Sequence, residues 1–194
     1  NQALISASGS QAGSIQIGNT STKSVDIAGA VFALGGVAIP SVNALTTPGS
    51  VAAASAVGVT PYSTNLSPSL SLPSVASVIS TPAVGGSITI QGQVINVGST
   101  AQLNAAGTGG GGSIVVGNAS TATLSSTGTL IATGLNEGSG GSIALTAGQL
   151  RVAGQLNASG YSGGKIQLTG LSTLASSARI STDGLSGLGG QAIL

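Results

Sequence analysis

The chain has 194 residues, with four basic and three acidic side chains, and its net charge of +1 offers no electrostatic footprint for DNA, RNA or anionic lipid. His, Cys, Met and Trp are absent, which excludes disulfides, thiolate or imidazole chemistry and the usual zinc and copper sites. Only three residues are aromatic, so the sequence predicts a narrow, aliphatic core. The longest nearly apolar run, residues 28–39, is too short for a membrane helix of roughly 20 residues, and we expect no transmembrane segment.

A glycine-led apolar motif recurs along the chain, from AGSIQIG near the N-terminus to GGQAIL at the end. Its copies begin at Ala12, Gly85, Gly111, Gly140, Gly163 and Gly189. The second glycines of the last five copies are 26, 29, 23 and 26 residues apart. A repeat of about 25 residues predicts a solenoid.

A second motif, an aliphatic residue followed by small residues and a glycine, follows the same period. Its glycines are Gly9, Gly35, Gly107, Gly134, Gly160 and Gly184. We expect these glycines to occupy equivalent corners with positive φ, where the chain turns from one strand to the next.

A third segment with alternating apolar residues lies between the two motifs, as in residues 25–27, 94–97 and 150–152. Each unit therefore contains three short strands, and no helical spacing of apolar residues is present. The sequence predicts one all-β domain over residues 1–194, a parallel β-helix of about seven coils. Stacking at about 4.8 Å per coil would give a rod roughly 35 Å long.

The alternation also predicts which side chains form the core ladders, because successive residues of a strand face opposite sides. One ladder runs through the first strand of each unit and another through the third. Their members are Ile88, Ile114, Ile143 and Ile166 in the first, and Leu103, Leu130, Leu156 and Ile180 in the second.

Residues 40–84 interrupt the period and contain all six prolines in a Ser/Thr/Ala-rich background. Proline cannot donate to a strand ladder, so continuous central strands are not expected there. The segment is interpreted as an excursion from one coil that packs on the outside of the rod; two degenerate coils or a disordered loop are the alternatives.

The stretch GGSIALTAGQLRVAGQLNASGYSGGKIQLTG, residues 140–170, resembles repeats of filamentous-haemagglutinin-type exoproteins of two-partner secretion. The resemblance extends over residues 1–39 and 85–194 and implies a right-handed β-helical shaft. The chain has no Asn-Pro dipeptide, an element of the motif in that family's secretion domain. The resemblance therefore implies a shaft segment that is exported to the bacterial cell surface or beyond and serves as an adhesin or filament. It identifies no ligand; a glycan or another surface is the partner class that we expect for the neutral polar faces.

The distribution of carboxylates argues against an enzyme. Asp26, Glu137 and Asp183 lie in different coils, whereas glycoside chemistry needs two carboxyl groups within about 10 Å of each other. No catalytic, cofactor or metal site is predicted, and a β-helical carbohydrate-active enzyme is the disfavoured alternative.

An ice-binding β-helix is a further alternative, but the outward positions show no threonine ladder. Glycosylation is left open by N-x-S/T sequons at Asn19, Asn65, Asn118 and Asn157.

The two ends of the sequence fall on different strands of the repeat. Residues 3–9 match a third strand and residues 190–194 a first strand. The chain is therefore expected to be either a piece of a longer β-helix or a subunit that stacks head to tail into a homo-oligomer or filament. If two copies are joined end to end, the coil at the junction lacks a second strand. Stacking would then either leave a notch there or take the missing strand from residues 40–84 of a neighbouring copy.

Overall fold

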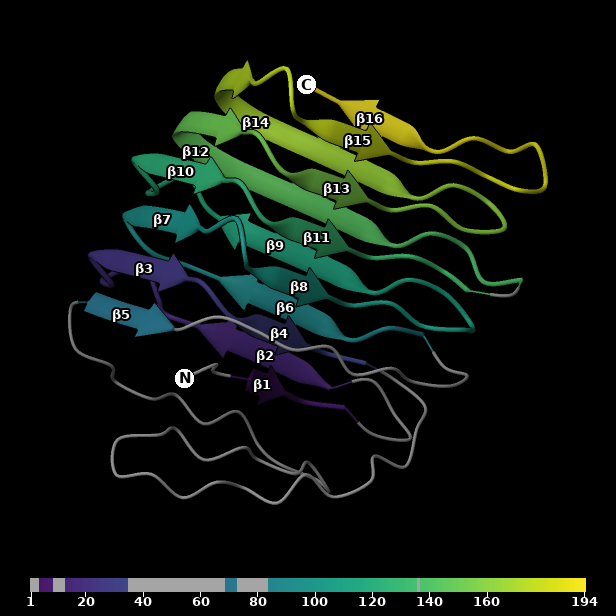
Figure 1. Ribbon diagram of the computed structural model, residues 1–194, viewed down its shortest axis with the longest axis horizontal. Coiled ribbons are helices and arrows are strands. Elements are labelled where there is room, and N and C mark those ends of the chain that lie inside the picture. The colour runs from purple at the N-terminus through teal and green to yellow at the C-terminus, as the bar shows by residue number, and fades with distance from the viewer. Residues whose placement is uncertain (1–3, 9–12, 35–68, 73–83, 136) are drawn as a thin grey trace.

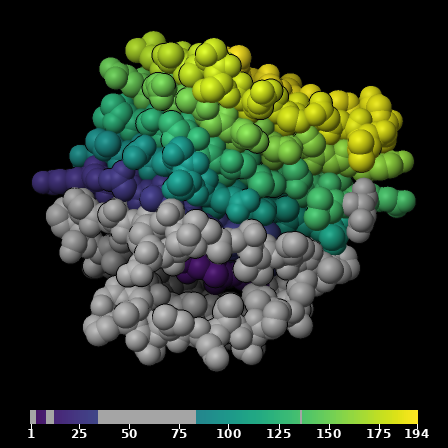
Figure 2. All heavy atoms as spheres, in the orientation of Figure 1, coloured from purple at the N-terminus to yellow at the C-terminus, as the bar shows by residue number. Residues whose placement is uncertain are grey.

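The computed structural model describes residues 4–8, 13–34, 69–72, 84–135 and 137–194. These residues form β-strands β1 to β16, and among them is no helix long and apolar enough to cross a membrane. The chain winds into a solenoid in which each strand pairs in parallel with its counterpart one coil along (Figure 1). Figure 2 shows successive coils as bands that follow the chain from purple to yellow.

Each coil has a first, a second and a third strand position, separated by corners. First positions are occupied by β2 (Ser14–Ile17), β6 (Ser87–Ile90), β9 (Ser113–Gly117), β12 (Ser142–Val152), β14 (Lys165–Leu174) and β16 (Gln191–Ile193). Both β12 and β14 are long enough to continue into the second position of their coils, and their pairing shifts register between Thr146 and Gln149.

The other two positions are occupied by shorter strands. Second positions hold β3 (Ser24–Ile27), β5 (Ser69–Leu72), β7 (Val94–Val97), β10 (Thr123–Ser126) and the later halves of β12 and β14. Third positions hold β1 (Leu4–Ser6), β4 (Ala30–Phe32), β8 (Gln102–Asn104), β11 (Thr129–Ile131), β13 (Gln155–Asn157) and β15 (Arg179–Ser181), which form a separate six-stranded sheet.

The solenoid has five complete coils, and the prediction of about seven is wrong. The predicted number of coils was too high because Ser14 and Ser87 lie 73 positions apart, which is about three repeat periods. In the structure β2 pairs directly with β6, β3 with β7 and β4 with β8, so no coil is inserted between them. The all-β parallel solenoid with three strands per coil is confirmed, while its right-handed winding stays a prediction.

The described part of the proline-rich segment, β5, extends the sheet of second strands. It pairs in parallel with β3 on the edge that β7 leaves free, from Ser24 with Ser69 to Ile27 with Leu72. β5 therefore occupies the second-strand place in the coil to which β1 contributes the third strand. The flanking coils pair directly with each other. The interpretation of residues 40–84 as an excursion stays a prediction, because apart from β5 and Val84 that segment lies outside the described residues.

The core is a continuous set of aliphatic ladders. Ile88, Ile114, Ile143 and Ile166 pair in register, as do Leu103, Leu130, Leu156 and Ile180. All of these side chains are at most 1% exposed except Ile180, which is partly buried against the same cluster. Ala105, Ala132 and Ala158 fill the neighbouring column where the walls approach. Thin aliphatic layers account for the near absence of aromatic residues.

The predicted corner glycines are stacked, but for a different reason from the one expected. Gly107 pairs with Gly134 and Gly160 with Gly184, while Gly9 and Gly35 lie outside the described residues. None of those four described glycines has a positive φ; the positive values among the described residues fall at Gly18, Gly110, Gly117, Gly170 and Gly187. The stacked corners need glycine because the backbone approaches closely. A Cβ at Gly160 would lie 2.2 Å from Gly140 N.

Candidate functional surfaces

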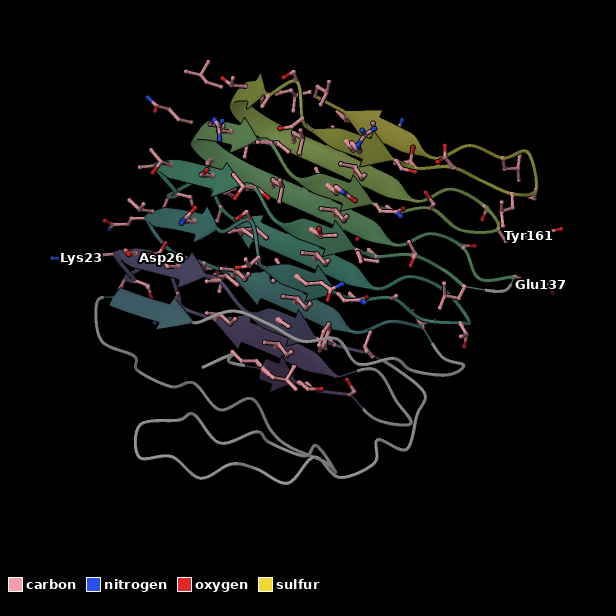
Figure 3. The ribbon with its side chains drawn as sticks, viewed as in Figure 1. Lys23, Asp26, Glu137 and Tyr161 are labelled. Atoms are coloured by element: carbon pink, nitrogen blue, oxygen red, sulfur yellow. The ribbon has the colours of Figure 1, made fainter. Side chains whose placement is uncertain are left out.

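The acidic residues are dispersed over the solenoid. Asp26 projects from β3 at one edge of the molecule, beside Lys23, whereas Glu137 lies in a loop at the opposite edge, near Tyr161 (Figure 3). Asn96 Nδ2 donates to Asp26 Oδ1 at 2.9 Å, so this carboxylate is used in a contact between coils. Asp183 follows β15 and accepts a hydrogen bond from Ser181 Oγ. Within the described ranges, no three His, Cys, Asp or Glu residues gather where they could hold a metal ion.

The outward faces carry mixed, mostly uncharged columns. The outer column of the first strands runs Gln16, Thr89, Val115, Ala144 and Gln167, and that of the second strands Asp26, Asn96, Ser125, Arg151 and Thr173. Neither column is a threonine ladder of the kind that a flat ice-binding face requires. Amide and hydroxyl groups occupy three of the five positions in each column, and the coils that carry these columns stack at about 4.8 Å.

An open groove of about 1060 Å³ runs along the corner that precedes the first strands. It is lined by glycine pairs and by Ser14, Ser87, Ser113 and Ser142. The glycines are required by coil stacking, because a Cβ at Gly112 would lie 2.1 Å from Gly86 O. Ser142 Oγ donates to Ser113 Oγ at 3.2 Å, so two of these serines are hydrogen-bonded between coils. The groove exposes backbone and hydroxyl groups, and one cation, that of Lys165.

Two turns of identical design link first and second strands, and sequence reasoning did not detect them. In each turn a positive-φ glycine precedes an asparagine, and a threonine follows three residues later, as in Gly117, Asn118 and Thr121. Asn118 Oδ1 accepts from Ser120 N at 2.8 Å, and Asn118 N donates to Thr121 Oγ1 at 3.0 Å. The same bonds, with the same lengths, hold the turn from Gly18 to Thr22. The repeated letters G-N-x-S-T were the available signal.

These turns also explain why two sequons are present. Asn19 and Asn118 use their side-chain oxygens to cap backbone N–H groups two residues on, as asparagine commonly does in turns. Asn157 does the same with Ser159 N at 2.9 Å. Asn65 lies outside the described residues. Three sequon asparagines therefore have a structural role that requires no attached sugar.

Buried hydroxyl groups offer no nucleophile with a partner base. Ser126 is fully buried in a core column between Val97 and Val152, and its Oγ has no hydrogen-bond partner. Thr108 Oγ1 is likewise buried and unpaired. Neither hydroxyl has a histidine to activate it, because the chain contains none.

No protein family, curated protein or solved structure matches this chain.

Proposed function

We propose that this chain is a non-catalytic shaft of an exported bacterial surface protein, which contacts glycans or neighbouring molecules through its neutral polar faces. The observation that carries the proposal is the combination of a continuous aliphatic core with outward columns of amide and hydroxyl groups. The charged groups are dispersed, as the separation of Asp26 from Glu137 illustrates. A surface of this kind offers many hydrogen bonds and little charge.

Support for display outside the cell comes from the resemblance of residues 140–170 to shafts of two-partner-secretion exoproteins. A β-solenoid suits this role because its coils repeat one supersecondary unit, so length is gained by adding coils. The absence of cysteine removes any chance of unwanted disulfides in an oxidising compartment.

The test is binding to immobilised neutral and acidic oligosaccharides at low and high salt. The Debye length falls from about 30 Å at 0.01 M to about 3 Å at 1 M ionic strength. Because hydrogen bonds to uncharged groups are not screened, we expect binding to neutral sugars to change by less than about twofold over this range. Arg151→Gln should leave binding unchanged, whereas Asn96→Ala should weaken binding that uses the second-strand face.

Loss of binding at high salt, or binding confined to acidic sugars, would contradict the proposal. The same binding assay also tests the enzymatic alternative, because the release of shorter oligosaccharides from the immobilised sugar would show catalysis. We expect the immobilised sugars to remain intact.

Head-to-tail assembly is a second proposal, and the strand inventory favours it. The described residues contain six first, six second and six third strands. At one end of the stack β16 is a first strand that pairs with β14; at the other, β5 and β1 are second and third strands with no first strand of their own coil among the described residues. One copy's β16 with the next copy's β5 and β1 would complete a coil.

A further inference from the structure

An open trough of about 510 Å³ lies on the outer surface of the second strands, over β7, β10, β12 and β14, whose stacking is seen in Figure 1. One side of the trough is the outer column already described, from Asn96 to Thr173. The other side is a parallel column of residues that pair in register, namely Val94, Thr123, Gln149 and Leu171. We call the space between these two columns the second-strand trough.

The polar side chains of the trough are not used to hold the coils together. Elsewhere on the solenoid, outward hydroxyl groups bond between coils, as Ser159 Oγ does with Ser181 Oγ at 2.7 Å. The side chains of Thr123, Gln149 and Thr173 are exposed, and no other residue of the described ranges hydrogen-bonds to them. Their donors and acceptors are therefore available to an external molecule.

The composition of the trough matches an uncharged ligand that carries many hydroxyl groups. Arg151 is the one charged residue among those that line it. Hydroxyl and amide groups both donate and accept hydrogen bonds, as sugar hydroxyls require of their partners. Val94 and Leu171, at the two ends of one column, are 47% and 77% exposed and offer aliphatic surface to the CH groups of a ring. A neutral sugar combines these two kinds of surface.

An extended peptide matches the trough less well. Peptides that add to a sheet use the backbone groups of a free edge, but β10 is paired on one side with β7 and on the other with β12. The side chains on one face of an extended peptide also repeat about every 6.7 Å, whereas the two columns repeat about every 4.8 Å.

We propose that the second-strand trough binds a linear, neutral oligosaccharide that lies along the stack axis. This inference rests on the proposed function and identifies the face and the side chains that such a sugar contacts. From β7 to β14 the trough extends over three coil steps, or about 14 Å. Thr123 and Gln149 occupy the middle of their column, so they contact a sugar of any length that enters the trough.

The proposal is tested on the full chain by isothermal titration calorimetry with the neutral linear oligosaccharides that bind in the immobilised-sugar assay. Gln149→Ala should raise the Kd by about tenfold, the effect of losing roughly one good hydrogen bond. Thr123→Val, which keeps the shape and removes the hydroxyl, should raise it in the same direction. The matched control is Gln167→Ala, an outward glutamine of the first strands, which should leave the Kd unchanged. Unchanged denaturant melts would show that all three variants are folded.

The length of the sugar gives a second measurement. The Kd should fall as the oligosaccharide lengthens until it covers the four strands, and then become constant. A Kd that is the same for wild type, Gln149→Ala and Thr123→Val would overturn the trough while leaving the proposed function in place, and so would weakening by Gln167→Ala alone. If no neutral oligosaccharide binds wild-type protein, the proposed function itself fails, and this inference fails with it.

Discussion

Leu156 shows how a single ladder position stabilises the solenoid. It lies between Leu130 and Ile180 in the third-strand sheet and is 1% exposed. Leu156→Ala would leave a cavity in a thin core with little freedom to collapse, so we expect a loss of about 2 to 5 kcal/mol in the free energy of unfolding. Denaturant melts monitored by circular dichroism give this value. Gln155→Ala, at the neighbouring exposed position, should change it by no more than about 0.5 kcal/mol.

Equal losses for the two variants would show that the ladder is not a tightly packed core. Gln155 is a cleaner reference than Asn157, because Asn157 caps Ser159 N and its removal would cost a hydrogen bond. The ladders themselves were predictable because alternation within one strand reports directly which side chains face inward.

Gly141 tests whether the glycine pairs are set by close approach between coils. A Cβ at Gly141 would lie 2.1 Å from Gly112 O, a backbone atom that cannot move without shifting the adjacent coil. Gly141→Ala should therefore destabilise the protein by about 1 to 3 kcal/mol or more in denaturant melts. Gly189 is the matched control in the last coil, because nothing lies within 4 Å of a Cβ placed there. An equal effect at both positions would contradict the role of stacking.

The sequence predicted where the corner glycines fall but not why glycine is needed there. The motif places one glycine after each third strand, and positive φ is the usual local reason for such a choice. The actual reason at Gly160 is the backbone of the neighbouring coil, at Gly140. A contact between residues about 20 positions apart leaves no mark in the local pattern, so it could be recognised only from the stacked structure.

At the scale of an element, the turn from Gly117 to Thr121 links β9 to β10 within one coil and is hydrogen-bonded to the preceding coil. Thr121 is 1% exposed, and its Oγ1 donates to Gly92 O, 29 residues earlier, at 2.7 Å. Thr121→Val keeps the shape but leaves Gly92 O and Asn118 N without this partner. Unfolding measurements should show a loss of about 1 to 3 kcal/mol.

Thr22→Val is the matched variant in the equivalent turn. Thr22 Oγ1 accepts from Asn19 N within its own turn, and the side chain is only partly buried. The free energy of unfolding should therefore decrease less for Thr22→Val than for Thr121→Val. If the Thr22 variant were the more destabilising of the two, the bond to Gly92 would not be the important contact.

The strand elements were largely predictable, whereas their stacking across the proline-rich segment was not. Each strand has its own alternation, and the shared period of the two glycine motifs groups three strands into a coil. Ala30 pairs with Gln102, which lies 72 positions later in the sequence. From the repeat period alone, a separation of this length predicts additional coils between the two strands. The burial of Phe32 at an outward position was missed for a related reason, because Phe32 stands in a short run of apolar residues in which both faces look alike.

At the scale of the whole molecule, the two ends of the stack differ. The core-facing residues of β2, Ile15 and Ile17, are 7% and 4% exposed. At the other end Leu174 and Leu194 are 42% and 71% exposed. Head-to-tail stacking would bury the apolar side chains of Leu174 and Leu194, which favours assembly.

Stacking also fixes the repeat of the resulting fibre. A complete junction coil made of β16, β5 and β1 gives each copy six coils, at about 4.8 Å per coil, and hence an axial repeat of about 29 Å. This repeat is shorter than about seven predicted coils would give, because the proline-rich segment adds no coil between β4 and β6. Electron microscopy of the concentrated protein should show fibres with this repeat.

A matched pair of variants separates stacking from nonspecific aggregation. Leu194→Glu places a charge on the open end, where alternation from Ala192 makes the residue core-facing, and it should abolish the fibres. Leu171→Glu changes an equally exposed leucine whose partner, Gln149, faces outward, and it should leave the fibres intact. Protein that stays monomeric at all concentrations, or fibres that survive Leu194→Glu, would remove head-to-tail assembly, because a heterologous contact that does not close must propagate through that end.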